Sequence, residues 1–349
     1  MRAGRTVAAK PRRAAGMPRR GAGVGLSSAL IILLSLAAPP AANASFKRRD
    51  TGTNAAQFLK LGADARAAGM GGAVRALAED ATAVYWNPAG LSALRMRHAT
   101  FSHGAMYQGI FYDFLAYAQP VESILGRGRP RELRESQLGV LGVAFLYMNA
   151  GSLQEADNTG NATGGSFMPQ EFAGAVAWGS KLAPNFDVGI GMKYIFSKLY
   201  ESASTAAGDA GARLRMRLFQ MPLTLSVGAH NFGGSLRYGR ESQELPFYVS
   251  AGAALRPFKN FFLTGDVIAP RDNRIYGAAG MEFRRALTSK TGFSLRLGYN
   301  GMNDPKDLQG LSTLGFGAGV RTHRVDMDYA WTPFGVLTTG HRFSLSYRF

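Results

Sequence analysis

The 349-residue sequence has no cysteine. Disulfides and thiolate metal sites are therefore excluded, and the fold must hold without covalent cross-links. Its five histidines are scattered, without the H-E-x-x-H or H-x-x-x-H spacing that presents two metal ligands on one helix face. It also lacks a Walker A loop and a G-x-S-x-G nucleophile elbow. We expect no catalytic residue, no metal and no cofactor, and a protein that is not an enzyme.

Long hydrophobic runs are absent as well, because no apolar stretch in the body of the chain approaches the roughly 18 residues of a transmembrane helix. One short run, residues 26–38, follows a segment with seven Lys or Arg and no acid. Ala42 and Ala44 then have the spacing of an A-x-A cleavage site. We interpret residues 1–44 as a signal peptide that is removed on export.

The signal peptide also changes the charge of the protein. The full chain carries a net charge of +17, whereas the chain from Ser45 has 33 bases and 23 acids, a net charge of +10. This moderate excess argues against nucleic acid as a partner, and we interpret the basic residues 127–135 as a solvated loop. The basic leader is long, so translation starts at either Met1 or Met17.

Alternation of apolar and polar residues is abundant after residue 94. The apolar positions 293, 295, 297 and 299 share one face of a predicted strand, and 325–331 and 341–349 repeat the pattern. The candidate strands are about fourteen: 95–106, 109–119, 137–149, 171–182, 186–199, 209–219, 223–232, 246–256, 260–269, 274–284, 290–300, 311–321, 324–332 and 341–349. Many reach the length of about 9 to 11 residues that tilted transmembrane strands need.

The links between these strands alternate in length. Links such as 183–186 and 257–260 are short, whereas 150–170, 200–208 and 233–245 are long and rich in turn residues. Short inner turns and long outer loops are typical of a bacterial outer-membrane barrel. We therefore predict an all-β fold, a closed antiparallel transmembrane β-barrel of about 14 strands; a soluble β-sandwich or propeller is the alternative.

A barrel also explains the charged residues within strands, which can face a polar lumen while apolar residues face lipid. Since Asp326 and Asp328 lie on the strand beside Arg342 and Arg348, we expect ion pairs between them. Aromatic residues near strand ends, Phe262 and Phe334 among them, are expected in girdles at the membrane surfaces. The predicted lumenal charged residues are Asp266, Glu282, Arg296, Asp326, Asp328, Arg342 and Arg348.

The last nine residues, HRFSLSYRF, resemble the terminal signal by which outer-membrane barrels are recognised for assembly. Its outward apolar positions are Phe343, Leu345, Tyr347 and Phe349. The same segment must close the sheet against the first strand, because lipid does not tolerate an unpaired edge. We expect the barrel assembly machinery, membrane lipid and lipopolysaccharide to be partners.

Residues 45–94 do not alternate. They form Ala-rich, helix-compatible pieces that are interrupted by Gly69, Gly71 and Gly72 and end at Asn87-Pro88, because proline disfavours the helical region for the residue before it. Such a block has little to bury alone and is predicted to be a hatch or plug inside the barrel formed by residues 95–349.

This block resembles the N-terminal signature of the PorV/PorQ family, which is similar to the FadL-type transporters of hydrophobic compounds. The resemblance rests on LGADARAAGMGGAVRALAEDATAVYWNPAGLSAL and continues through 245–274 and 326–349. The signature residues that we select are Arg66, Gly69, Met70, Gly71, Gly72, Trp86, Asn87, Pro88, Ala89 and Gly90. The resemblance implies a 14-stranded barrel with a short hatch, in the bacterial outer membrane.

Two functions follow from the resemblance. The first is a docking or shuttle barrel for secreted proteins, as in type IX secretion, whose partners are cargo proteins. The alternative is a FadL-like transporter whose ligand is a hydrophobic small molecule that binds near the hatch. An assembly-related protein without cargo is a third possibility.

Overall fold

The computed structural model describes residues 52–106, 109–125, 138–157, 159–199, 201–303, 310–335 and 338–349. The predicted signal peptide, residues 1–44, and the basic segment 127–135 lie outside these ranges. Within the described part of the chain, no helix has the length and apolar character needed to span a membrane.

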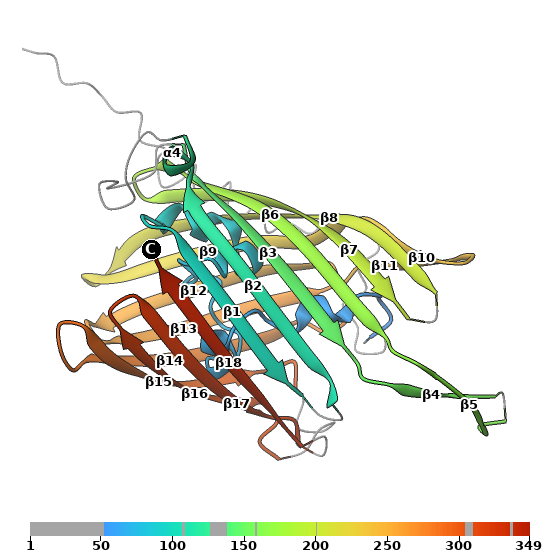
Figure 1. Cartoon of the computed structure of the whole chain (residues 1–349). Helices are drawn as coiled ribbons and strands as arrows, with labels where there is room; N and C mark the ends of the chain where they lie inside the picture. Colours follow the sequence, from blue (N-terminus) through green and yellow to red (C-terminus); the bar gives the residue numbers. More distant parts are fainter. Residues whose placement is uncertain are drawn as a thin grey trace, which may run out of the picture.

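Antiparallel strands close into a single barrel (Figure 1). The order around the wall is β1, β18, β17, β16, β15, β14, β13, β12, β9, β8, β7, β6, β3 and β2. Their bounds are β1 His98–Ala105, β2 Phe111–Pro120, β3 Val140–Asn149, β6 Gln170–Ala183, β7 Phe186–Lys198, β8 Ser202–Leu218, β9 Met221–Gly233, β12 Tyr248–Phe258, β13 Phe261–Pro270, β14 Tyr276–Ala286, β15 Thr291–Asn300, β16 Leu314–Thr322, β17 Val325–Pro333 and β18 Thr339–Arg348. The predicted 14-stranded barrel is confirmed.

The barrel closes between its first and last strands. β1 pairs with β18 from His98 opposite Arg348 to Ala105 opposite His341, without a break in register. The C-terminus therefore lies at the end of the barrel where β1 begins. We call this the inner end, and the end at Ala105 the outer end.

Strand residues alternate between two environments. Large apolar side chains are exposed on the outside of the wall, including Phe101, Leu115, Phe145, Val176, Ile190, Val267, Leu295, Phe343 and Leu345. Charged and polar side chains on the same strands are buried inside, among them Lys193, Asp209, Asp266, Glu282 and Arg296. This is the inverse of a soluble protein and matches an outer surface that contacts lipid.

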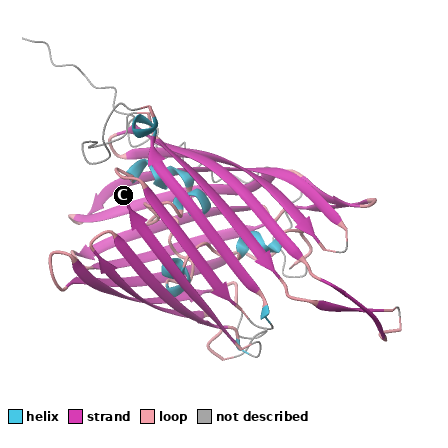
Figure 2. Cartoon of the chain, viewed as in Figure 1, coloured by secondary structure: helices cyan, strands magenta, loops and turns pink. Residues whose placement is uncertain are grey.

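The segment before the barrel forms short helices inside it (Figure 2). These are η2 Gln57–Lys60, α2 Ala65–Gly69, α3 Ala83–Trp86 and η3 Pro88–Ala93. The carboxylate of Asp64 accepts the Ala67 N–H and caps α2. α3 stops before Asn87, which is extended ahead of Pro88 and caps η3 through its side chain. We refer to residues 52–94 as the hatch.

Two outer links contain additional strands that the sequence pattern did not predict. A hairpin of β4 Leu153–Ala156 and β5 Ala162–Phe167 extends from the barrel, and β10 Ser235–Tyr238 pairs with β11 Glu241–Glu244 (Figure 1). A further correction concerns residues 202–208, expected in a loop but part of β8. Their backbone pairs with β7 from Ser202 opposite Lys198, so the strands continue without an apolar pattern. A short helix, α4 Val121–Ile124, follows β2.

Candidate functional site

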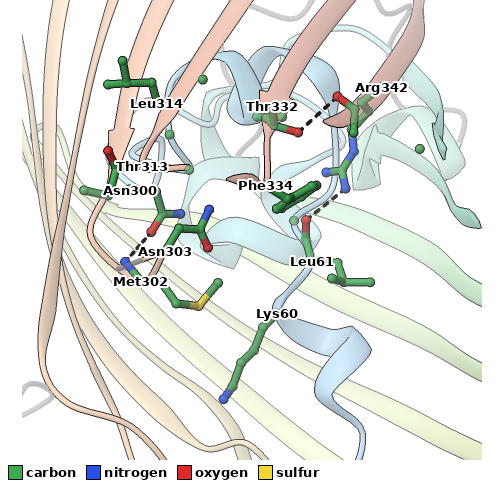
Figure 3. Close-up of a pocket in the computed structure, with 18 of the residues that line it drawn as sticks. Lys60, Leu61, Asn300, Met302, Asn303, Thr313, Leu314, Thr332, Phe334 and Arg342 are labelled. Carbon is green, nitrogen blue, oxygen red and sulfur yellow. Dashed lines mark hydrogen bonds between the residues drawn. The ribbon is translucent and has the colours of Figure 1, made fainter. Parts of the chain in front are cut away.

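A cavity of about 150 Å³ lies between the hatch and the outer end of the wall (Figure 3). We call it the outer cavity. Hatch side chains form one side, and the outer ends of β1 and β13 to β18, with the loops between them, form the rest. Its lining residues include Lys60, Leu61, Arg75, Trp86, Met106, Ile268, Tyr276, Asn300, Met302, Asn303, Leu314, Phe334 and Arg342.

The lining is mainly apolar. Leu61, Ile268, Met302, Leu314 and Phe334 surround the space. A cavity of about 150 Å³ lined by such side chains is large enough for benzene. Phe334 thus faces this cavity, which corrects its expected place in a girdle at the membrane surface.

Three cations also reach the outer cavity. Lys60 and Arg75 are paired with Asp272 at 2.6 Å and with Asp266 at 3.1 Å. Arg342 is 8% exposed, its guanidinium lies 5.5 Å from the centre of the Tyr112 ring, and its Nη2 donates to the Leu61 carbonyl at 3.0 Å.

The expected ion pairs between Asp326, Asp328 and the two β18 arginines are found only in part. Asp326 pairs with Arg348 at 3.1 Å, whereas Asp328 pairs with Arg296 at 2.7 Å. Arg342 pairs with no carboxylate in the described part of the chain. The register explains this result, because Arg342 lies opposite Ala330 and is displaced from both aspartates towards the outer end.

A smaller space of about 30 Å³ adjoins the outer cavity and shares several of its lining residues. Tyr85 and Tyr248 complete its walls. The guanidinium of Arg75 lies over two rings here, 5.4 Å from the centre of Trp86 and 5.5 Å from that of Tyr248. The hatch therefore supplies both the apolar floor of the site and a cation held against it.

The glycines of the hatch signature contact the wall directly. Gly71 and Gly72 have φ of +63° and +78°, a backbone conformation that favours glycine. The Gly71 backbone lies so close to β15 that a Cβ on Gly298 would overlap it. Gly69 and Met70 approach Gly317 and Gly280 in the same way. This turn fixes the hatch to one side of the wall.

The Asn-Pro-Ala element fixes the opposite side. Asn87 donates its side-chain N–H to the Val227 carbonyl of β9 at 3.3 Å. Its oxygen fills the space beside Gly211 of β8, where a Cβ would overlap it. Pro88 and Ala89 lie against the glycines at 179 and 189, and Gly90 packs on Ala78 within the hatch.

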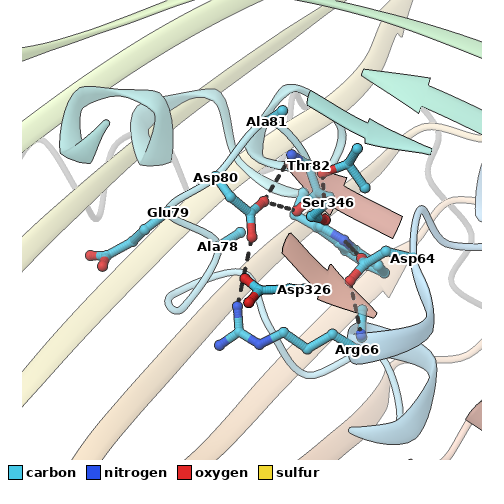
Figure 4. A network of polar contacts seen from close by, with 12 residues as sticks. Asp64, Arg66, Ala78, Glu79, Asp80, Ala81, Thr82, Asp326 and Ser346 are labelled. Atoms are coloured by element: carbon cyan, nitrogen blue, oxygen red, sulfur yellow. Dashed lines mark hydrogen bonds and ion pairs between the residues drawn. The ribbon is translucent and has the colours of Figure 1, made fainter. Parts of the chain in front are cut away.

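Buried ion pairs join the hatch to the strands of the wall. Arg66 donates to Glu282 at 3.0 Å, and the same fully buried carboxylate also accepts from Arg284 at 2.6 Å and Arg296 at 2.8 Å. Arg66 further approaches Asp80 at 3.8 Å (Figure 4). Removing one partner of such a buried pair costs about 3–5 kcal/mol, so these contacts oppose displacement of the hatch.

Asp64 lies in the hatch, outside the strands of the wall (Figure 4). Burial raises the pKa of its carboxyl to about 6, and the nearby charge of Asp80 acts in the same direction. Its Oδ1 accepts the indole N–H of Trp86 at 3.1 Å. Asp64 therefore contacts Trp86, which lines the outer cavity, and also lies near the charge of Asp80.

The predicted residues of the C-terminal signal face away from the lumen. Phe343, Leu345, Tyr347 and Phe349 are exposed on the outside, as a lipid-facing strand requires. The ring of Phe349 lies 4.7 Å from that of Tyr347. No cluster of His, Asp or Glu suited to a metal ion occurs among the residues that the structure describes.

The sequence pattern did not identify Lys60, Arg75, Tyr276 or Met302 as site residues. They come from separate segments that meet only when the barrel closes around the hatch. The Gly-rich and Asn-Pro signature marked the floor of the site, and Arg342 was the one lining residue of its walls that the sequence predicted to face the lumen.

Comparisons of the sequence and of the structure with known proteins give different results. No protein-family model matches the sequence, and no curated protein sequence does. Solved structures match at the level of the fold. The Ralstonia pickettii toluene transporter TbuX has a TM-score of 0.56 and 11% identity, over 82% of this chain and 98% of TbuX.

Two further neighbours are also channels for aromatic compounds. The CymD monoaromatic hydrocarbon channel has a TM-score of 0.54 and 10% identity, over 82% of this chain and 98% of CymD. The Pseudomonas putida toluene transporter TodX has a TM-score of 0.51 and 9% identity, over 82% of this chain and 96% of TodX. The chain therefore shares the barrel fold of these three proteins, and a relationship to the PorV/PorQ family stays a prediction.

Proposed function

We propose that this protein is an outer-membrane channel of FadL type for hydrophobic small molecules, which bind in the outer cavity. The observation that carries the proposal is an apolar cavity of about 150 Å³ in the lumen, with the hatch as its floor. The apolar outside of the barrel fits a lipid bilayer, and the toluene transporters TbuX and TodX share the fold. No step of this function needs catalysis or a cofactor.

The volume limits the ligand to about the size of one aromatic ring, because about 150 Å³ accommodates benzene. The adjoining space beside Trp86 and Tyr248 allows a substituent. Aromatic walls favour aromatic ligands through stacked and edge-to-face contacts. Toluene is therefore a suitable first probe.

Binding is tested by titrating toluene into the purified barrel in detergent and following tryptophan fluorescence, since Trp86 lines the cavity. Ala278→Phe, which fills the cavity from β14, is expected to abolish the saturable change. The matched control is Ala279→Phe, because the next residue on the strand is exposed on the outside of the wall. Equal binding by Ala278→Phe would remove the outer cavity as the site.

Docking of secreted proteins is the second candidate, on a different observation. The β4–β5 hairpin extends from the barrel with most of its residues exposed, a shape suited to contact with a protein at the cell surface (Figure 1). Deletion of residues 153–167 should then remove surface partners from a pull-down with intact cells while toluene binding persists. A genome without a type IX translocon would count against this candidate.

A further inference from the structure

A second and larger cavity, of about 610 Å³, opens at the inner end of the barrel, on the other side of the hatch. We call it the inner vestibule. Unlike the outer cavity, it has many charged side chains in its lining. The bases are Arg66, Arg256, Arg284, Arg285, Lys290, Arg296, Arg321 and Arg348, and the acids are Asp64, Glu79, Asp80, Asp326 and Asp328.

Most of these acids already have cationic partners. Asp326 pairs with both Arg321 and Arg348, and Asp328 pairs with Arg296. Glu79 lies 3.4 Å from Arg213. The remaining two, Asp64 and Asp80, are bound to groups of the hatch.

Glu282, behind the lining, serves three arginines at once, Arg66, Arg284 and Arg296. Each carboxylate around the vestibule therefore already binds an arginine or a group of the hatch. Within the described part of the chain, Arg256 and Lys290 have no carboxylate partner. The vestibule thus carries more positive charge than its own acids compensate.

Two of the cations, Arg256 and Arg284, lie over the aromatic ring of Phe262. The guanidinium carbons of Arg256 and Arg284 lie 5.3 Å and 4.7 Å from the centre of its ring, so at most 10.0 Å, the sum of these distances, separates them. Cation–π contact lowers the cost of placing like charges on one ring. Phe262 lines the vestibule, which corrects its expected position in an outward-facing girdle.

The donors of these arginines are only partly used. Arg284 binds Glu282 through Nη2, and Arg256 donates through Nε and Nη2 to the Lys259 carbonyl. A guanidinium has five N–H donors in a planar arrangement that suits oxyanions. Both groups therefore retain donors for an anion in the vestibule.

We propose that the inner vestibule is a binding site for a phosphate group, held by Arg256, Arg284 and Lys290. A phosphate monoester carries about −1.5 to −2 charges and three acceptor oxygens, which matches several neighbouring cations better than a single carboxylate does. The group can belong to a soluble phosphate monoester or to the head of a phospholipid at the inner rim. The site is independent of the outer cavity and of toluene binding.

The test uses the full barrel in detergent and glycerol phosphate as the soluble probe. Isothermal titration should show saturable binding that weakens with added salt, because exposed charges are screened. The combined variant Arg256→Gln, Lys290→Gln should weaken binding about tenfold or more, since it removes charge-assisted hydrogen bonds. Heat-modifiable migration verifies that each variant is folded.

Arg217→Gln is the matched control, because Arg217 is an exposed arginine at the inner end of β8 that does not line the vestibule. The lipid arm uses native mass spectrometry to count phosphatidylglycerol molecules retained by each variant. Binding of glycerol phosphate assigns a soluble ligand, and loss of one retained lipid in the combined variant alone assigns a headgroup. The proposal is overturned if neither probe binds, if acetate competes equally well, or if Arg217→Gln has the same effect.

Discussion

Arg66 of the hatch and Glu282 of β14 form an ion pair of 3.0 Å around a carboxylate that is fully buried. The pair joins two segments that are more than 200 residues apart in the sequence and makes the hatch part of the wall. Because Arg284 and Arg296 share the same carboxylate, its loss leaves three guanidinium groups with too little negative charge. The hatch is therefore a fixed element of the folded barrel.

Glu282→Gln is expected to lower the stability of the barrel by about 3–5 kcal/mol, because it uncouples a buried charge network. The temperature at which the purified protein loses heat-modifiable migration measures the effect. Glu241→Gln is the control, since Glu241 is exposed on β11 and forms no ion pair among the described residues. Equal melting of the two variants would show that the Glu282 network does not stabilise the fold.

Gly211→Ala is expected to open the channel. The added methyl group would occupy the position of the Asn87 side-chain oxygen and push the Asn-Pro turn away from β8. Single-channel recording in planar bilayers should then show a higher conductance than that of the unmodified barrel.

Gly265→Ala provides the comparison, because the nearest atom to a Cβ there is 4.0 Å away. Its conductance should equal that of the original protein. If Gly211→Ala conducts no better than Gly265→Ala, the Asn87 contact is not part of the seal.

Asp64 predicts a pH dependence of stability. Its folded pKa of about 6 lies above the usual pKa of 3.8 for an aspartate, so between these values the folded state binds more protons than the unfolded state. The contribution is complete below about pH 4 and is lost as the pH rises through 6. It amounts to about 2–3 kcal/mol, since each pKa unit corresponds to about 1.4 kcal/mol.

The measurement is the urea midpoint of the barrel at pH 5 and pH 7, compared with that of Asp64→Asn. The amide oxygen can still accept from Trp86, but the side chain no longer titrates. The original protein should gain more stability on acidification than the variant does. Parallel changes in the two proteins would assign the pH dependence to other groups.

The sequence predicted the strands in which apolar and polar residues alternate and missed the segments of strand that lack this alternation. Period-two alternation identified the strands at 293–299 and 341–349, because each position on them faces either lipid or lumen. It missed the start of β8 at Ser202, where small polar residues rely on backbone pairing with β7. Backbone pairing needs no alternation of apolar and polar side chains, so the sequence pattern does not mark this part of β8.

The candidate site was harder to predict for a different reason. Trp86 and Arg342 were identified as hatch and lumenal residues, but their common cavity depends on the register of β18 against β17 and on the path of the hatch. Arg342 was expected to pair with an aspartate and instead donates to the Leu61 carbonyl. Alternation along each strand predicts which side chains enter the lumen. Their partners depend on the shear of the barrel, which is the stagger between its strands.

Deletion of Phe349 is expected to impair assembly. Its N–H donates to the Arg97 carbonyl at 3.1 Å, which extends the pairing that closes the barrel, and its ring packs at 4.7 Å and 6.3 Å from Tyr347 and Tyr117. The fraction of membrane protein with heat-modifiable migration should fall, because closure is weakened and the predicted terminal signal is removed. Phe343→Ala removes a ring of the same kind, also exposed to lipid, from the same strand and leaves the terminus intact. A comparable loss in Phe343→Ala would mean that lipid-facing aromatic area, and not the chain end, determines assembly; full assembly without Phe349 would remove its role in closure.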